Sequence, residues 1–584
     1  MHFQQYYQNE LALLRELGKE FSNAFPKLAP FLSQVDQDPD VERLLEGFSF
    51  VTAGIHRKLD DELPELTRTL FELLWPDVLR LQPSCTIIEY RPVMHALTSR
   101  RVVPRGIEVD SKPVSGTRCR FRTCNEVEVY PVEIGEITCE QVNKGTEIGI
   151  RLDVTTGNII DHLENRPLKL YVDGDRYSSA NLMLYLLKYL AQVSISVSGD
   201  QENNLVYIDR NEIRLADVTG GGSLLVEDIC AFPGHRILQD YFIMPEKYHF
   251  IEIHGMDRLS VLSSARSYTL RFQFDRRLPK EIRISRNSFR LYCVPAVNLF
   301  SISADPLRMD NTKVFYRIRP AVENVAHYQI YSVLNMVGYE YGGRQRHEFE
   351  PFLKATGDCQ ITAEHRNRFQ LYNQPAVVGD GLDTFVGFSG PVCRSNEVVS
   401  ISLDLICTNG NLPQQLQCED ICHATGNTPE FVKAVNVLAP TTALLPLPGS
   451  SGLWSLIASL GANYTANLNS ENLKVLLTAC NRLANYNRQS AREHELRMSA
   501  LKDIKYEFRN WLIRGVPVNA DSITIQMDGS KYGSEGELYL FMSMLNLYFH
   551  HTRSINSVRE FIAEDIVNGE IYTWPIQSSH LPTC

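Results

Sequence analysis

The spacing of apolar residues changes along the chain and predicts helical, strand-rich and mixed stretches. Between residues 38 and 76 apolar residues recur at helical spacing, and one third of the helix circumference carries Val41, Leu44, Leu45, Phe48, Val51, Thr52, Ile55 and Leu59. That width is typical of a stripe that faces a protein core. The stretch therefore predicts two helices joined by an acidic corner. An earlier helix is expected over residues 3–25, because Pro26 ends its pattern.

Phe50 lies almost opposite this stripe, and Gly47, Ala53 and Gly54 lie around it. Small residues let a neighbouring backbone approach closely, although they also weaken the helix. We therefore interpret Phe50, Gly47 and Gly54 as a candidate interface with a second partner. Periodicity leaves one alternative open, namely that the helix is buried inside its own domain.

From Cys85 to residue 438 the apolar period is close to two, as in half-buried β-strands. The clearest predicted strands are residues 87–90, 106–109, 118–122, 126–130, 193–197, 205–208, 248–253, 268–274 and 289–294. Helices are expected over residues 179–191 and 234–242, and exposed loops over residues 342–347 and 379–383. This pattern predicts a large antiparallel β-rich middle.

The proline, glycine and serine content of residues 439–452 is typical of a linker. Beyond it we expect helices over residues 454–460 and 470–483, and a strand over residues 522–527. Residues 538–549 form a helical pattern that is apolar on almost every side, so this helix is buried in a domain or in an interface. Its residues Phe541, Leu545 and Phe549 are therefore further interface candidates.

These patterns predict an α+β multidomain protein, because 584 residues are too many for a single core. The expected order is an N-terminal helical unit (1–84), a β-rich domain with one helix (85–200), a second β-rich region (201–438), the linker (439–452) and a C-terminal α+β domain with a buried helix (453–584).

Composition narrows the function. Hydrophobic residues make up 44% and charged residues 22% of the chain, which favours a folded protein throughout. The net charge of −11 is spread without long runs, so nucleic acid is not an expected partner. We expect no membrane span and no secretory signal. The thirteen scattered cysteines therefore indicate reduced thiols in a cytosolic protein.

Two groups of polar residues are candidate catalytic sites. Asp60, Asp61 and Glu62 form the densest carboxylate cluster, which could serve acid–base chemistry or a hard cation. However, consecutive acids point in different directions, and they precede a helix whose N-terminus favours negative charge, so capping is the favoured interpretation. Glu252 and His254 share one face of a predicted strand, which is a loose pairing by itself.

Other motifs are incomplete. Cys418, Cys422 and His423 resemble half of a zinc site without a second half. The glycines before Ser223 lack the Lys-Ser/Thr of a phosphate loop, and no Gly-x-Ser-x-Gly occurs. Cys119 and Cys124 are expected to be small core residues. We therefore predict no enzyme activity, no cofactor and no metal site.

Several motifs in a fixed order carry a family resemblance. The N-terminal set is Glu42, Arg43, Glu46, Gly47, Asp60, Asp61 and Glu62. The later sets are Gln239, Asp240, Tyr241, Phe242, Asn298, Leu299, Phe300, Asn409, Leu412 and Pro413. Together they resemble the TssF (VasA/ImpG) family of type VI secretion baseplate subunits over nearly the whole chain. One departure is Asp240, where the family usually has Glu.

The resemblance implies an assembly protein without catalysis. It implies a wedge in which two copies of TssF join TssG, with TssE and TssK attached, and it implies N-terminal helices that bundle with TssG. Six such wedges would surround the VgrG spike hub and form the platform for the Hcp tube and the contractile sheath. It also implies a location in the bacterial cytoplasm, docked near the inner membrane through partner subunits.

Two other classes of function stay open at this point. One is a metal-dependent hydrolase that uses Asp60, Asp61 or the pair Glu252 and His254. The other is a structural protein that assembles with itself and needs no TssG.

Overall fold

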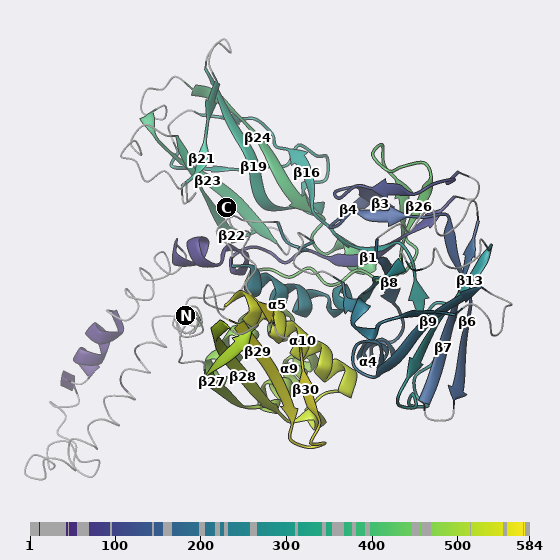
Figure 1. Ribbon diagram of the computed structural model, residues 1–584. Coiled ribbons are helices and arrows are strands. Elements are labelled where there is room, and N and C mark those ends of the chain that lie inside the picture. Colours follow the sequence, from purple (N-terminus) through teal and green to yellow (C-terminus); the bar gives the residue numbers. More distant parts are fainter. Residues whose placement is uncertain are drawn as a thin grey trace, which may run out of the picture. The chain divides into compact units, whose positions relative to one another are not determined.

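In the computed structural model the chain folds into two compact units (Figure 1). The first contains Met1–Leu74 and Pro448–Ala458, and the second contains Trp75–Leu447 and Ser459–Cys584. The structure describes residues 43–44, 46–54, 69–93, 96–142, 145–155, 166–197, 205–216, 222–226, 232–256, 265–309, 313–340, 346–352, 367–376, 381–391, 398–446, 469–513, 516–552, 558–575 and 577–578, with single positions 7, 11, 258 and 456.

The first unit is helical wherever it is described, at residues 43–44, 46–54 and 69–74. Of the helix predicted over residues 3–25, Tyr7 and Leu11 are described, and both are helical. The corner at Asp60, Asp61 and Glu62 and the helix predicted over residues 454–460, apart from Leu456, lie outside the described residues.

A six-stranded sheet joins distant parts of the second unit (Figure 1). Its order is β25 (Ile421–Ala424), β3 (Glu108–Val114), β4 (Thr117–Thr123), β15 (Cys293–Val297), β1 (Cys85–Pro92) and β26 (Val432–Asn436). The first four residues of β1 are all buried, and the one polar side chain among them, Thr86, donates its hydroxyl to the carbonyl of Leu438. The register pairs Ile88 with Val294 on one side and with Asn436 on the other.

Two further sheets combine strands from both sides of residue 200. One has the order β10 (Val206–Ile208), β9 (Leu190–Val197), β13 (Ser267–Phe274), β7 (Gly145–Val154) and β6 (Val132–Val142). The other has the order β11 (Ile213–Leu215), β12 (Phe250–Ile253), β8 (Leu168–Val172) and β14 (Phe289–Arg290), and β2 (Arg101–Val103) pairs with β5 (Val127–Val129). The expected boundary between residues 200 and 201 is therefore wrong, because periodicity shows which face of a strand is buried but not its partner.

A third β region surrounds a core that includes Phe300, Phe349 and Leu405. One sheet contains β16 (Phe300–Ser303), β24 (Val398–Thr408), β19 (Gln329–Glu340), β20 (Arg346–Glu348) and β17 (Leu307–Arg308). The other contains β18 (Phe315–Arg317), β23 (Leu382–Ser389), β22 (Arg368–Pro375) and β21 (Glu350–Pro351). The loops predicted over residues 342–347 and 379–383 are thus partly wrong, because residues 346–347 and 382–383 are in strands.

The predicted linker is packed where it is described. Thr441 donates its backbone N–H to the carbonyl of Cys85 (2.8 Å), and Leu444 forms an antiparallel bridge with Gln82. Residues 439–446 therefore pack along the chain segment that leads into β1 rather than connect domains loosely. Residues 447–452 lie outside the described part of the chain.

The helices of the second unit gather around the C-terminal sheet and α5. They are α4 (Arg176–Leu187), α5 (Pro233–Ile243), α8 (Ser470–Cys480), α9 (Arg488–Ala500) and α10 (Glu535–His551), and the sheet contains β27 (Leu501–Ile513), β28 (Val516–Met527), β29 (Val558–Asp565), β30 (Ile571–Thr573) and β31 (Gln577–Ser578). Short 3-10 turns are η2 (Pro76–Val78), η3 (Arg210–Glu212), η4 (Pro245–Tyr248), η6 (Val325–His327), η8 (Leu412–Gln415), η9 (Arg482–Asn485) and η10 (Gly529–Lys531).

Helix α10 begins at the N-cap Ser534, whose side chain accepts from the backbone N–H of Glu537. Gly536 permits its close approach to α4, since a Cβ there would lie 2.3 Å from the carbonyl oxygen of Ala180. Helix α5 also lies beside α10 (Figure 1). The two helices pack through the rings of Tyr241 and Phe541, whose centroids are 5.8 Å apart. The predicted fold class, α+β with a β-rich middle and a buried C-terminal helix, is confirmed.

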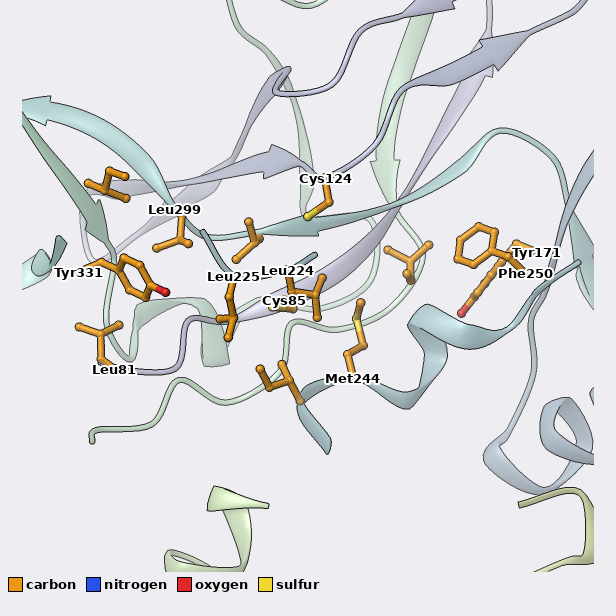
Figure 2. Close-up of a cluster of buried hydrophobic side chains, with 14 residues drawn as sticks. Leu81, Cys85, Cys124, Tyr171, Leu224, Leu225, Met244, Phe250, Leu299 and Tyr331 are labelled. Carbon is orange, nitrogen blue, oxygen red and sulfur yellow. The ribbon is translucent and has the colours of Figure 1, made fainter. Parts of the chain in front are cut away.

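A core between the six-stranded sheet and α5 fixes the middle of the second unit. Figure 2 shows Leu224 and Leu225 beside Cys85, with Cys124 above them and Met244 below, at the end of α5. Cys85 of β1, Cys119 of β4 and Cys124, which directly follows β4, are all buried. The prediction that Cys119 and Cys124 are core residues is therefore confirmed.

Candidate interaction surfaces and the buried motif residues

The predicted core stripe of the N-terminal helix faces outward in this chain. Leu44, Phe48 and Val51 are 73%, 60% and 58% exposed, and their spacing of four and three residues places them on one helical face. The prediction that these three residues face a core is therefore wrong for the chain alone. We call Leu44, Phe48 and Val51 the exposed stripe. A row of large apolar side chains in contact with water is typical of a surface that another molecule covers.

A different face of the same helix is covered. Ser49 and Ala53, four residues apart, are fully buried, whereas Phe50 is 58% exposed. A Cβ added at Gly47 or Gly54 would meet no atom within 4 Å, so both glycines border open space. The surface around Phe50 thus has room for the close approach that the small residues predict.

Helix α10 offers no such surface. Phe541, Leu545 and Phe549 are at most 2% exposed, and they pack inside the chain. The ring of Phe541 contacts Tyr241 and Phe242 of α5, and the ring of Phe549 contacts Phe561 of β29. The expectation that these three residues form an interface is therefore wrong, because α4, α5 and the C-terminal sheet already cover the helix.

The motif on α5 holds a buried ion pair. Asp240 accepts a hydrogen bond from Lys247 Nζ at 2.5 Å, and both side chains are at most 6% exposed. The same carboxylate oxygen lies 3.4 Å from the backbone N–H of Leu224 and from Ser223 Oγ. Buried charges need such partners, so the pair ties the segment at residues 222–226 to α5 and η4. Its neighbours Gln239 and Tyr241 are also buried, and Phe242 is half-buried.

The motifs around Asn298 and Asn409 form a second buried network. Asn298 Nδ2 donates to the carbonyl of Arg120 (2.7 Å) and to Asn409 Oδ1 (2.9 Å). Asn298 Oδ1 accepts from Thr408 Oγ1 and from the backbone N–H of Asn409, both at 2.7 Å. These bonds join β4, the β15–β16 turn and the end of β24, so they connect two sheets.

Other motif residues divide between core and surface. Leu299 and Phe300 are buried in two separate cores. Pro413 is buried and Leu412 half-buried in η8, whereas Arg43, Glu46 and Gly47 are exposed. Glu42 lies outside the described residues. The central motifs that sequence reasoning marked as a family signature thus hold the sheets together.

Of the two candidate catalytic groups, Asp60, Asp61 and Glu62 lie outside the described residues, and Glu252 takes part in ion pairs. Glu252 is 8% exposed and forms an ion pair with Lys169 (3.0 Å), while His254 Nε2 lies 3.4 Å from its other oxygen. Cys418 and Cys422 are exposed. The part of the chain that the structure describes contains no group of three or more His, Cys, Asp or Glu side chains arranged to hold a metal ion.

Sequence reasoning missed an aromatic stack around His235. Its ring stacks on Trp75 at 4.4 Å between centroids and lies parallel to Tyr548 of α10 at 6.2 Å. Burial lowers the pKa of His235 to about 3, so this imidazole is neutral at pH 7. The three residues are far apart in the sequence, and no local pattern could have predicted their contact.

Every helix in the part of the chain that the structure describes is too short or too polar to cross a bilayer.

The described residues define a multidomain α+β protein. Its central motif residues cross-link sheets, and its N-terminal helix exposes an apolar stripe. The chain belongs to the family "Type VI secretion system, TssF", whose model matches residues 1–580. It is 25% identical to the type VI secretion system component TssF1 of Pseudomonas aeruginosa strain PAO1, over 99% of both chains.

Two solved structures share the fold. One is a chain of the TssK-TssF-TssG baseplate subcomplex of a type VI secretion system, determined by cryo-electron microscopy; its TM-score is 0.76 at 24% identity, covering 93% of this chain and 99% of that one. The other is a chain of the baseplate complex from the type VI secretion system, with a TM-score of 0.62 at 22% identity and 99% of both chains covered.

Proposed function

We propose that this protein is a structural subunit of the type VI secretion baseplate and binds the TssG and TssK proteins of its own system. Family membership supports the baseplate role, and one of the two solved structures of similar fold is a chain of a TssK-TssF-TssG baseplate subcomplex. The observation that carries the proposal is the exposed stripe of Leu44, Phe48 and Val51, an apolar surface that a soluble chain alone would leave in water.

The finer features of this role are part of the same proposal. Two copies of the chain bind one TssG, and TssE joins the wedge. Wedges then surround the VgrG spike hub and start assembly of the tube and sheath. The exposed stripe and the surface around Phe50, Gly47 and Gly54 provide two different faces of one helix, which suits a subunit that must contact both TssG and a second copy of itself.

Aspartate substitutions test this assignment. We expect Leu44→Asp and Phe50→Asp to reduce binding of TssG at least tenfold, because each puts a charge in an apolar contact. Leu496→Asp is the matched control, since Leu496 is also an exposed leucine on a helix, α9, but lies in the other unit. The measurement is the yield of TssG that co-purifies with the tagged full-length chain.

The two variants separate the two faces. If Phe50→Asp leaves TssG binding intact while Leu44→Asp abolishes it, the surface around Phe50 is not the TssG contact. If neither variant differs from Leu496→Asp, the stripe is not an interface. A stable ring formed by the chain alone, measured by mass in solution, would instead favour assembly without TssG.

A further inference from the structure

The C-terminal sheet ends in a long edge strand. The order β27-β28-β29-β30 places β27 at one edge of this sheet, and among the described strands β27 pairs only with β28 (Figure 1). With thirteen residues it is the longest strand that the structure describes. The outer side of such a strand has a row of backbone N–H and C=O groups that another extended segment can bind.

Side chains along this edge are exposed on both faces of the strand. Lys505 and Glu507 are exposed on one face, and Phe508, on the other face, is 74% exposed. The ring centroid of Phe508 lies 4.9 Å from that of Tyr506, whose hydroxyl donates to Asp521 Oδ2 (3.0 Å). The edge therefore combines a row of charges with an aromatic side chain that lies largely in water.

Charges of alternating sign occupy one face of β27. Asp503, Lys505, Glu507 and Arg509 stand at every second position, so acids and bases alternate along the strand. In the register with β28, all four lie opposite uncharged residues. The neighbouring strand therefore supplies no opposite charge at the positions directly across the ladder.

This charge pattern is complementary to itself when the strand is reversed. If two copies of β27 lie antiparallel with their Tyr506 residues opposite each other, Lys505 of each copy faces Glu507 of the other, and Asp503 faces Arg509. A shift of this centre by one residue places Lys505 or Glu507 opposite itself, and like charges directly opposite are destabilising. Only the centre at Tyr506 pairs all four charged positions with opposite charges.

Lysines on an edge strand commonly discourage pairing and so protect a sheet from aggregation. In β27 the bases alternate with acids, so the same charges disfavour shifted registers and favour one. In that register Ile504 of the second copy lies opposite Phe508, and this contact covers the exposed ring. Charge and apolar complementarity thus indicate the same occupant, a second β27.

We propose that β27 pairs with β27 of a second copy of this chain, antiparallel and centred on Tyr506, so that two C-terminal sheets become one. A two-fold axis perpendicular to the sheet relates the copies, and the same residues form both halves of the contact. The inference goes beyond the proposed function and does not depend on it, because the contact needs no other protein. It lies on the second unit, whereas the surface around Phe50 lies on the first.

Charge reversal tests the register. Lys505→Glu places two acids opposite each other at two positions of the dimer, so we expect the dimer dissociation constant to rise at least about fivefold. The double variant Lys505→Glu/Glu507→Lys exchanges the two charges and should restore the original constant. Lys502→Glu is the matched control, because it changes the net charge equally but lies opposite the uncharged Asn510. Sedimentation equilibrium of the full-length chain at graded concentrations measures all four proteins.

Two results would overturn the proposal. One is a chain that stays monomeric at every concentration, and the other is a Lys505→Glu variant that dimerises as well as Lys502→Glu. Neither result bears on the binding of TssG, so the proposed function is tested separately.

Pairs of cysteines check the geometry independently of affinity. Directly opposite residues of antiparallel strands are close enough for a disulfide. A mixture of Ile504→Cys and Phe508→Cys chains should therefore form a 504–508 disulfide on mild oxidation, identified by peptide mass spectrometry. A mixture of Asp503→Cys and Phe508→Cys chains is the control, because these side chains lie on opposite faces. A 503–508 disulfide, or no 504–508 disulfide, would contradict the register.

Discussion

The N-terminal helix and helix α10 both have large apolar surfaces, but only one of them is covered by its own chain. Leu44, Phe48 and Val51 are more than half exposed, whereas Phe541, Leu545 and Phe549 are almost completely buried. Helix α10 is apolar on every side and is enclosed by α4, α5 and the C-terminal sheet. The N-terminal helix is apolar on selected faces and has Ser49 and Ala53 on its covered side.

The difference shows that hydrophobicity alone does not identify an interface. A helix with apolar residues on almost every side is unfavourable in water, so it is buried by other elements of its own domain. A narrower apolar stripe can remain exposed until a partner arrives. Five substitutions test this comparison, from the largest expected effect to the smallest.

Asp240→Leu tests how much the buried ion pair of α5, the helix that packs on α10, contributes to stability. We expect it to lower the free energy of unfolding by about 3–5 kcal/mol, because Lys247 would remain buried without its partner. The double variant Asp240→Leu/Lys247→Met removes both charges and should recover most of this loss. Urea unfolding of the full chain measures both, and a single variant as stable as its parent would contradict the role of the ion pair.

Leu545→Ala tests the burial of α10 directly. We expect a loss of about 2–5 kcal/mol, because the truncated side chain leaves a cavity in a fully buried position. Leu545→Met, which nearly conserves volume, should cost less than about 1.5 kcal/mol. Binding of TssG per folded molecule should not change. Weaker TssG binding without a loss of stability would indicate instead that α10 contributes to an interface.

His235→Phe tests the stack that joins α5 to α10. An unfolded histidine has a pKa of about 6.5, and the folded pKa of His235 is about 3. The unfolded state therefore binds more protons between these values, and stability falls as the pH falls below about 6.5. Phenylalanine keeps the stack and removes this titration. The variant should thus gain about 2 kcal/mol relative to the unsubstituted protein on going from pH 7 to pH 5.

His494→Phe provides the contrast to His235→Phe. Burial also lowers the pKa of His494, to about 4, but its ring is hydrogen-bonded to Asn481 and Thr478. We expect His494→Phe to lose stability already at pH 7, because it breaks these two bonds. The ring nitrogens of His235 have no hydrogen-bond partner among the described residues, so His235→Phe breaks none. Urea unfolding at the two pH values separates these outcomes, and an unchanged pH dependence in His235→Phe would contradict the assignment.

Leu44→Ala should have the smallest effect on stability. We expect a change within about 0.5 kcal/mol, because the side chain is 73% exposed. TssG binding should nevertheless weaken. A loss of more than about 2 kcal/mol in urea unfolding would show instead that the stripe belongs to a core, as the periodicity first predicted.

Local patterns in the sequence predicted where helices and strands form more accurately than they predicted which elements pair or pack with each other. The predicted helices at residues 179–191, 234–242, 470–483 and 538–549 correspond to α4, α5, α8 and α10. Helix α9 was missed because Arg488–Ala500 is largely polar and has no apolar stripe. The long strands β19 and β24 were missed because their partners, rather than their own alternation, determine their extent.

The interaction sites were predicted only in part. Small residues around Phe50 indicated a surface, but spacing could not show whether Leu44 or Phe541 would be covered. The motif residues Asp240 and Asn298 were found from the sequence, yet their buried partners could not be inferred from it.

The pairing of β1 also affects how the protein is made. Thr86 Oγ1 donates to the carbonyl of Leu438, a residue 352 positions later in the chain. At a translation rate of about 5–20 residues per second, the ribosome needs roughly 20–70 s to synthesise the segment between them. During that time the buried start of β1 has no final partner on one side. An unpaired strand edge favours aggregation, so we expect cells that lack chaperones to accumulate the nascent chain as aggregates.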